Sequence, residues 1–482
     1  MAYLSGSFLL FTAVLLLVYN IFPYRFRPYV LLVGSLVFVG SHGIAGLTLV
    51  SLTSLLAFFL GFLINKSSKG KKALFILSEI LILLPWLGFK LSGYTGAFPF
   101  ITVVGISFYS LVLYSYLYDV YTGAVLPETN PFIFLSTVMF FPNIVQGPIM
   151  KYNVLRDGIK NSERPDLNAF GEALLKILFG VFLKLVIADK AALLVNRVYA
   201  SYESLTGLCI ITAAVLYSAE LYTDFSACVY ISKGVAEMFG IHILMNFKRP
   251  YFSASFKEFW RRWHISLGSY LADYVYIPLG GNRKGKTRKC LNLLVVFLIS
   301  GIWHGTGFNF ILWGILHGIY RVFEEITGLD KKIPKKGIGM STYGLCFRPL
   351  RAIHAHELGP SRANGEVRDV VHCIGMSTYG LCFRPLRAIH AHVLGPSRAN
   401  GEVRDVVHCI GLFSKRLSVL IFTVFGWMIF RASSLTEALR LCIFMFKGIP
   451  ESFKSLLSLI KELYGMKEFL ILLFAMLILF IK

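Results

Sequence analysis

Long apolar runs separated by short polar loops constrain this chain more than any other feature of its sequence. A helix that crosses a bilayer needs about 20 mainly apolar residues, and runs of that kind recur throughout the 482 residues. The chain is 56% hydrophobic and only 15% charged, whereas a soluble domain carries about 25% charged residues. A soluble enzyme is therefore excluded. Abundant aromatic residues and the lack of a heptad repeat also exclude a disordered or coiled-coil chain.

The candidate membrane spans share an apolar composition but differ in length. Those near 28–41, 131–149 and 291–324 contain Gly, Pro or His, which predicts broken or re-entrant helices. Irregular backbone at membrane depth is tolerated only inside protein or along a cavity, so we expect an all-α, multi-pass transmembrane helical bundle with a central tunnel. The first run is expected to be a retained span rather than a cleaved signal. The candidate spans are 4–22, 28–41, 44–64, 73–91, 100–122, 131–149, 172–195, 206–223, 291–303, 307–324, 416–430 and 467–481.

Basic residues dominate the charge balance, with 48 Lys and Arg against 26 Asp and Glu and a formal net charge of +22. They lie mostly in short loops between the apolar runs, which is typical of cytoplasmic loops in membrane proteins. Membrane lipids are therefore the expected surroundings, and nucleic acid is not an expected partner, because no basic module stands clear of the spans. The eight cysteines include no zinc-type Cys-x-x-Cys pair, so neither a zinc ribbon nor a disulfide framework is predicted.

One segment breaks this pattern, because residues 339–374 recur as residues 375–410 with a single difference, Glu357 against Val393. Solenoid repeats usually diverge and need about three units. Two near-identical copies therefore indicate a recent tandem duplication or an inserted element. Their histidines and cysteines make a zinc site conceivable, although a polar loop with incidental histidines is the simpler interpretation. The ligands of such a site would be His354, His356, His372 and Cys373.

Three regions follow from this organisation. We expect a transmembrane core over 1–338, a duplicated extramembrane insert over 339–410, and C-terminal transmembrane helices of the same core over 411–482. Because the sequence stops inside an apolar run at Lys482, the expectation is that this core is truncated.

The stretch 246–320 holds the residues best suited to chemistry, because polar residues are costly within a membrane and usually face a protein interior or a cavity. His304 follows the basic loop ending at Lys289 by 15 residues, which is about 22 Å along a helix. It therefore lies well inside a hydrocarbon core about 30 Å thick. Gly301 and Gly305 leave room for another chain to approach. A neutral imidazole there can accept a proton from a hydroxyl; the alternative is a core histidine bonded to a neighbouring helix.

Two further histidines lie in the same stretch. His264 ends the segment Trp260-Arg-Arg-Trp-His, which predicts an amphipathic interfacial helix, so His264 is either a site residue or an interface residue. His317 is 13 residues after His304, about 220° around an ideal helix. One uninterrupted helix cannot direct both rings into one site, so we expect His317 to pack behind the site or support it. His42 and His242 are isolated and receive no role.

Several motifs occur together around these histidines. They include W-R-R-W-H-I-S-L from Trp260, D-Y-V-Y-I-P-L-G-G-N-R from Asp273, G-I-W-H-G from Gly301 and W-G-I-L-H-G from Trp313. With F-F-P-N-I-V-Q-G-P, Y-T-D-F-S and G-W-M-I-F-R-A elsewhere, this combination resembles the membrane-bound O-acyltransferase family. Within that family it looks closest to the bacterial alginate O-acetyltransferase branch. D-alanyl transfer proteins of teichoic acid synthesis are a more distant likeness. One departure is A-C-V-Y over 227–230, where the family usually has G-Y-S-D.

The resemblance implies a helical membrane fold with a central tunnel. It implies an acyltransferase that takes an acyl group, most simply acetyl, from a cytoplasmic thioester donor, acetyl-CoA or an acyl carrier, to a hydroxyl acceptor. No bound cofactor and no metal are expected. An extracytoplasmic acyltransferase or an acceptor-glycan partner protein would complete the transfer to a cell-envelope polysaccharide. The chain would then lie in the inner, or cytoplasmic, membrane of a bacterium.

The resemblance also assigns residues. His304 matches the catalytic histidine of the family and His264 its second signature residue, so we expect His304 to act as general base or acyl relay and His264 to position donor or acceptor. Two tryptophans beside these histidines and three polar residues at the expected cytoplasmic mouth are the candidates for substrate binding, although a solvated turn is the alternative for the last two. They are Trp263, Trp303, Asp273, Asn282 and Arg283.

Three other functions stay open at this point. D-alanyl transfer to teichoic acid would differ in its donor, a D-alanyl carrier protein. A transporter could use intramembrane histidines as a proton relay, but transporters often contain two related halves, and the clear repeat in this sequence is the tandem insert. A degenerate copy that only scaffolds a partner predicts that His304→Ala changes nothing.

Overall fold

The computed structural model describes residues 5–95, 103–330, 396–448 and 452–481, and this part of the chain is helical, with no strand. The predicted all-α fold is therefore confirmed. The chain divides into two units, and the larger comprises residues 1–330 and 415–477. All features described below belong to this larger unit unless stated otherwise.

Most of the duplicated insert, including the four histidine and cysteine residues that could form a zinc site, lies outside the described residues. Its expected role as an extramembrane loop stays a prediction, and so does the central tunnel. Within the described part of the chain, four helices are long and apolar enough to cross a membrane. They are Ile44–Lys66, Lys71–Thr95, Gly207–Met238 and the Ile410–Arg431 portion of a longer helix.

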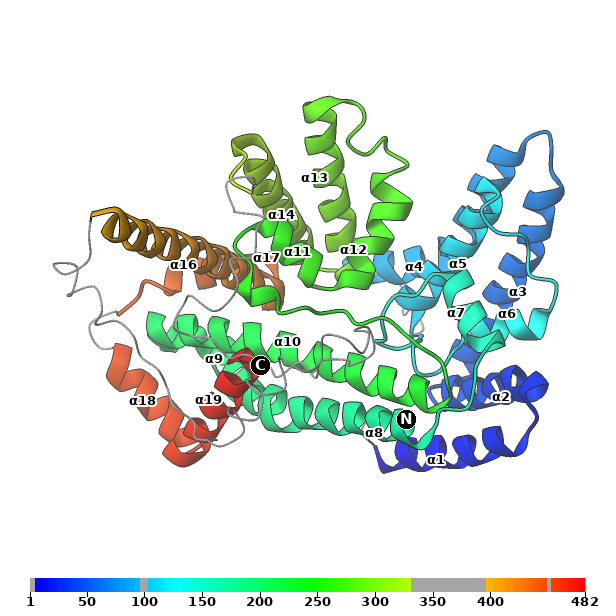
Figure 1. Ribbon diagram of the computed structural model, residues 1–482, viewed down its shortest axis with the longest axis horizontal. Coiled ribbons are helices and arrows are strands. Elements are labelled where there is room, and N and C mark those ends of the chain that lie inside the picture. The colour runs from blue at the N-terminus through cyan, green and yellow to red at the C-terminus, as the bar shows by residue number, and fades with distance from the viewer. Residues whose placement is uncertain (1–4, 96–102, 331–395, 449–451, 482) are drawn as a thin grey trace, which may run out of the picture. The chain divides into compact units, whose positions relative to one another are not determined.

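The N-terminal helices pack through aromatic rings, as where Phe8, Phe38 and Phe141 contact one another. After the short sixth helix the chain runs irregularly over 139–151, which confirms the break predicted near 131–149. The break predicted near 28–41 is wrong, because this segment forms one continuous helix over Arg27–Gly40. These helices are drawn blue to cyan in Figure 1. They are α1 (Gly6–Ile21), α2 (Arg27–Gly40), α3 (Ile44–Lys66), α4 (Lys71–Thr95), α5 (Ile106–Thr122), α6 (Pro131–Val138) and α7 (Tyr152–Lys160), with a 3-10 turn at Tyr24–Phe26.

The middle of the chain is built on α10 (Gly207–Met238), which lies beside α8 (Leu167–Phe182) in Figure 1. Two glycines allow this close approach: a Cβ on Gly180 would lie 2.8 Å from a backbone oxygen of α10, and one on Gly234 would lie 2.6 Å from a backbone oxygen of α8. The chain continues from α8 through a π-helix at Leu183–Ala188 into α9 (Asp189–Ser201).

The next elements surround the predicted site. They are a 3-10 turn at Pro250–Phe252, α11 (Phe256–Arg262), α12 (Ile265–Leu271), a second π-helix at Ala272–Tyr276, α13 (Gly285–His304) and α14 (Phe308–Thr327). Helices α13 and α14 form an antiparallel hairpin (Figure 1). Within it Gly301 and Gly314 face each other. A Cβ on Gly314 would lie 2.5 Å from the carbonyl oxygen of Phe297, so only glycine permits this approach.

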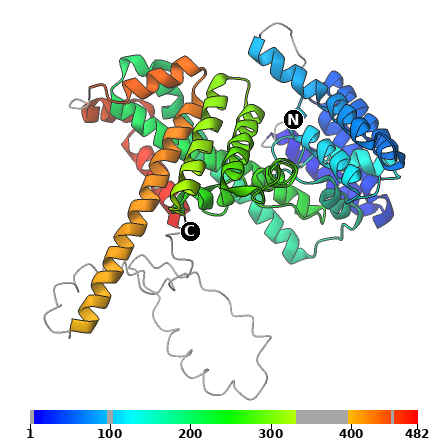
Figure 2. The same cartoon turned by 90° about the horizontal axis from the view of Figure 1, so that it is seen from above.

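The C-terminal helices are α16 (Pro396–Arg431), α17 (Leu435–Phe444), α18 (Ser452–Leu463) and α19 (Met466–Ile481). The C-terminal half of α16 packs on α14, where the rings of Phe422 and Tyr320 lie 5.3 Å apart. Figure 2 shows this end of α16, in orange, next to the yellow-green α14. Gly426 brings α16 close to His317, because a Cβ at Gly426 would lie 2.4 Å from the Nε2 atom of that histidine.

Candidate active site

His304 is the last residue of α13, where the chain turns through Gly305–Gly307 into α14. Its side chain is half-buried and is enclosed by aromatic rings from three helices. The ring centroids lie 4.9 Å from Trp303, 5.3 Å from Trp313 and 5.4 Å from Phe430. Gly301 and Gly305 predicted that another segment packs closely against this turn. This is confirmed, and the segment is α14.

His264 lies between α11 and α12 and faces His304. The centroids of the two imidazole rings are 6.2 Å apart. His264 is only 4% exposed, so its ring lies inside the protein rather than on its surface. The amphipathic pattern holds for Arg261, which is exposed, but α11 ends at Arg262 and the chain then turns inward. Burial lowers the pKa of His264 well below its usual range, which keeps the ring neutral at pH 7.

The backbone of His264 is strained, with a left-handed φ of 45° that non-glycine residues rarely adopt. Neighbouring segments hold it there. The backbone N–H of Ile265 donates to the carbonyl of Asn246 at 2.9 Å, and that of Ser266 donates to the Asn246 side chain at 3.0 Å. The Ser266 hydroxyl in turn accepts from the N–H of Ile149 at 2.9 Å. Strained residues that are held in this way cluster at functional sites.

Trp303 joins the two histidines, since its ring lies 6.2 Å from that of His264 as well as beside His304. Its indole N–H donates to the carbonyl of Ser107 at 3.3 Å, and its ring contacts Phe108. Trp303 therefore contacts both histidine rings, and its expected part in substrate binding stays a prediction. Phe225 of α10 completes the enclosure, with its ring 4.7 Å from that of His264.

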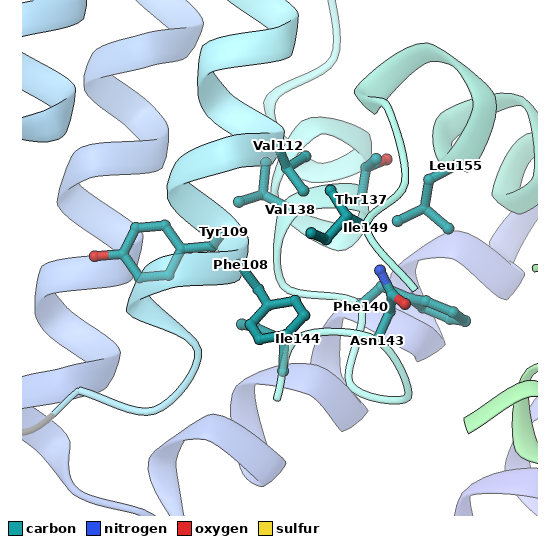
Figure 3. A pocket seen from close by; sticks show the side chains of 10 residues that line it. All are labelled: Phe108, Tyr109, Val112, Thr137, Val138, Phe140, Asn143, Ile144, Ile149 and Leu155. Carbon is teal, nitrogen blue, oxygen red and sulfur yellow. The ribbon is translucent and has the colours of Figure 1, made fainter. Parts of the chain in front are cut away.

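A small cavity lies behind Phe108, and Figure 3 shows its lining. The side chains come from α5, α6, the irregular segment 139–151 and α7, and include Val112, Asn143 and Leu155. Neither His264 nor His304 lines this cavity, so it is separate from the histidine pair.

The other predicted binding residues fall into two groups: three polar ones lie in or after the second π-helix, and Trp263 directly precedes His264. Asn282 and Arg283 are exposed in the turn before α13, and the 20 residues of that helix separate them from His304 by about 30 Å. Asp273 lies in the second π-helix and forms an ion pair with Lys151 at 2.7 Å. Trp263 is 4% exposed and packs in the aromatic core.

His317 does not contact His304 directly but lies behind Trp313, which separates the two rings. It is fully buried, and its ring lies 5.1 Å from that of Trp313, which also contacts His304. The break between α13 and α14 places both histidines around one tryptophan, and this position agrees with the predicted packing role of His317.

Sequence reasoning missed Lys90. This residue of α4 is 5% exposed, and its ammonium group donates to the carbonyl of Trp303 at 2.7 Å. The signal was a lysine inside the apolar run 73–91. Phe225 and Phe430 occur within the sequence motifs, but no sequence signal marks them as site residues, because their contacts with the histidines depend on the tertiary fold.

The arrangement is suited to proton transfer, because two imidazole rings lie close together among aromatic rings. Within the described residues, no group of three or more His, Cys, Asp or Glu side chains could hold a metal ion. The two imidazole rings lie about 6 Å apart, and imidazole is the commonest general base in enzymes. The surrounding aromatic rings lower the local polarity, which strengthens electrostatic interactions at the reacting atoms.

Comparison with known proteins connects this geometry to a family. The sequence pattern of the membrane-bound O-acyltransferase family matches residues 124–328, a range that contains both His264 and His304. A probable alginate O-acetylase of Pseudomonas putida is 34% identical over 350 residues, which cover 68% of this chain and 72% of that protein. A peptidoglycan O-acetyltransferase of Helicobacter pylori is 39% identical over 39% of this chain and 37% of its own length.

A more distant relative is a teichoic acid D-alanyltransferase of Streptococcus thermophilus, 27% identical over 56% of this chain and 68% of its own length. The family match and the extent of the alginate O-acetylase alignment confirm the resemblance seen in the motifs. The chain is a membrane protein and an O-acyltransferase, and it belongs to the membrane-bound O-acyltransferase family.

Proposed function

We propose that this enzyme moves an acetyl group from a cytoplasmic thioester donor across the membrane for O-acetylation of an extracytoplasmic polysaccharide. The observation that carries the proposal is the histidine pair: His264 and His304 come from separate segments, and their rings lie 6.2 Å apart inside an aromatic enclosure. The names of the relatives, an alginate O-acetylase and a peptidoglycan O-acetyltransferase, support acetyl as the group and a glycan as the final acceptor.

In the proposed reaction His304 acts as the general base. Its free ring nitrogen takes the proton from an acceptor hydroxyl while the hydroxyl oxygen attacks the thioester carbonyl. The carbon–sulfur bond then breaks, and the leaving thiolate takes the proton back from the imidazolium. The products are an O-acetyl ester and a free thiol, and His304 returns to its neutral form. General base catalysis of this kind contributes about 100- to 10,000-fold.

His264 and Trp303 position the reacting groups in this proposal. His264 is held neutral by burial, and its Nδ1 atom has no hydrogen-bond partner within the described residues, so it is free to bond to donor or acceptor. Trp303 contacts both histidine rings and forms an apolar wall beside them. Trp263, which lies in the core behind them, would act only by supporting this wall.

The donor, acetyl-CoA or an acyl carrier, would enter at the other end of α13. Asp273, Asn282 and Arg283 are half-buried or exposed there, and a basic turn suits the phosphates that such donors carry. An extracytoplasmic acyltransferase or an acceptor-glycan partner protein would accept the acetyl group on the far side. This arrangement requires the inner, or cytoplasmic, membrane of a bacterium.

The test is ester-linked acetate on the cell envelope of a null strain that carries either the wild type or His304→Ala. A matched control is His242→Ala, because His242 is exposed and has no role in the site. We expect the wild type and His242→Ala to restore acetate and His304→Ala to restore none at equal membrane expression. Acetate restored by all three would contradict His304 as the catalytic residue.

The D-alanyl relative favours a second candidate donor. Envelope ester-linked D-alanine is therefore measured on the same samples. D-alanine restored by the wild type in place of acetate would replace the acetyl proposal with D-alanyl transfer. Neither ester restored by the wild type would favour a degenerate scaffold or a transporter.

A further inference from the structure

Lys90 is a buried cation at the backbone of the catalytic segment. It lies near the C-terminal end of α4 and is 5% exposed. Its Nζ atom donates to the carbonyl oxygen of Trp303 at 2.7 Å, the residue directly before His304. It also interacts electrostatically with His304. A charged side chain buried at membrane depth is costly and usually has a function.

The surroundings of Lys90 explain how the charge is accommodated. Among the ion pairs of the described residues, none includes Lys90, although α4 also carries a buried carboxylate at Glu79. The cation instead lies 5.6 Å from the ring centroid of Trp86. The Trp303 carbonyl is one of the last four of α13, which lack partners within the helix, and the negative end of a helix dipole favours a cation. Lys90 therefore acts as a C-terminal cap supplied by another helix.

Two further contacts fix the same turn to α4 and α5. A Cβ on Gly93 would lie 2.5 Å from the side chain of Thr306, so α4 approaches the turn after His304 closely. Ser107 of α5 binds both tryptophans: its hydroxyl accepts from the Trp86 indole at 3.2 Å, and its carbonyl accepts from the Trp303 indole at 3.3 Å. Among these contacts of α4 and α5 with the turn, Lys90 supplies the one charged side chain in the described structure.

We propose that Lys90 is a positioning residue for acyl transfer, which caps α13 through the Trp303 carbonyl and so holds His304 against His264. The inference rests on the proposed role of His304. A catalytic group displaced by 1 Å can lose about 100-fold in rate. The side chain does not reach the reacting atoms in this proposal, so its loss affects turnover more than substrate binding.

The experiment uses the full-length chain in lipid vesicles with acetyl-CoA as the donor probe. We expect Lys90→Met, which keeps the length and removes the charge and donor, to lower kcat by about 10- to 100-fold with KM within about twofold. Lys90→Arg, which keeps both, should recover most of this loss. The matched control is Lys72→Met, because Lys72 is exposed on the same helix and should change neither constant.

A second measurement does not depend on activity. Diethyl pyrocarbonate modifies neutral imidazole, and mass spectrometry gives the rate at the His304 peptide. We expect Lys90→Met to change this rate by threefold or more and Lys72→Met to leave it unchanged. If Lys90→Met fails to fold, the comparison is made with Lys90→Gln against Lys90→Arg.

The proposal is overturned if folded Lys90→Met, or its Gln replacement, keeps both kcat and the His304 labelling rate within twofold of the wild type. It is also overturned if kcat falls only in proportion to the folded fraction while labelling is unchanged. A wild type that transfers no acetyl group while labelling still depends on Lys90 would reject the proposed function and leave the positioning role supported.

Discussion

The two ends of α13 differ in burial, composition and charge. At the C-terminal end, His304 is half-buried among the rings of Trp303, Trp313 and Phe430. At the N-terminal end, Arg283 and its neighbours are exposed. Charges that remain in water attract ligands over a distance but bind each of them weakly, whereas a group enclosed by apolar rings interacts strongly with the few atoms that reach it. In the proposed reaction the helix would thus separate capture of the donor from the transfer chemistry.

The largest difference between the two ends should appear in turnover. We expect His304→Gln to lower kcat for acetyl transfer by about 100- to 10,000-fold, since it removes the proposed base while keeping the side-chain length. Arg283→Gln should leave kcat within about twofold and raise KM for acetyl-CoA by at most about fivefold, because an exposed ionic contact contributes no more than about 1 kcal/mol. Steady-state kinetics in vesicles measures both. Equal losses of kcat in the two variants would contradict the separation.

An intermediate effect is expected on stability at the glycine contact near the C-terminal end. Gly314→Val would force a side chain onto the Phe297 carbonyl, and overpacking of this kind costs about 1 to 3 kcal/mol. Thermal unfolding in detergent should therefore show a lower melting temperature. Gly171→Val is the matched control, because nothing lies within 4 Å of a Cβ at Gly171 in α8. Equal melting temperatures for the two variants would show that the hairpin relaxes around the new side chain.

The smallest effect should come from the ion pair between Lys151 and Asp273. The two side chains are 36% and 34% exposed, so Asp273→Asn should lower the free energy of unfolding by no more than about 1 kcal/mol. The difference should shrink as salt is added. Glu462→Gln, which affects the longer 3.5 Å pair with Arg197, serves as the comparison. A loss above about 2 kcal/mol that persists in high salt would indicate that Asp273 is structurally essential.

Much of the fold was predictable from the long apolar runs and from residues that break helices. Pro142 and Gly147 predicted the irregular segment after α6, and the short run before His304 predicted the end of α13. Composition was less informative for the surroundings of His264. The amphipathic W-R-R-W-H segment has the composition of a surface helix, but its last two residues turn inward after a helix of seven residues.

The site was predictable only in part. The depth of His304 followed from its distance to the last basic loop, but its pairing with His264 came from a family resemblance. The contacts of Lys90, Phe225 and Phe430 join segments far apart in the sequence, and no local pattern encodes such contacts. An isolated lysine inside an apolar run was the one available signal, and intramembrane charges of this kind warrant a functional hypothesis from the outset.

The two π-helices have a consequence for how this chain tolerates insertions and deletions. Each lies beside an ion pair: Lys184 binds Asp189 at 2.9 Å and Asp224 at 2.7 Å, and Asp273 binds Lys151. A π-turn contains one residue more than an α-turn. Removing one residue between Lys184 and Asp189 would turn the π-turn into an ordinary α-turn, so the residues after it would keep their facing. Asp189 would then follow Lys184 by four residues in place of five, still on the same side of the helix, so loss of a single codon here would leave these charges together.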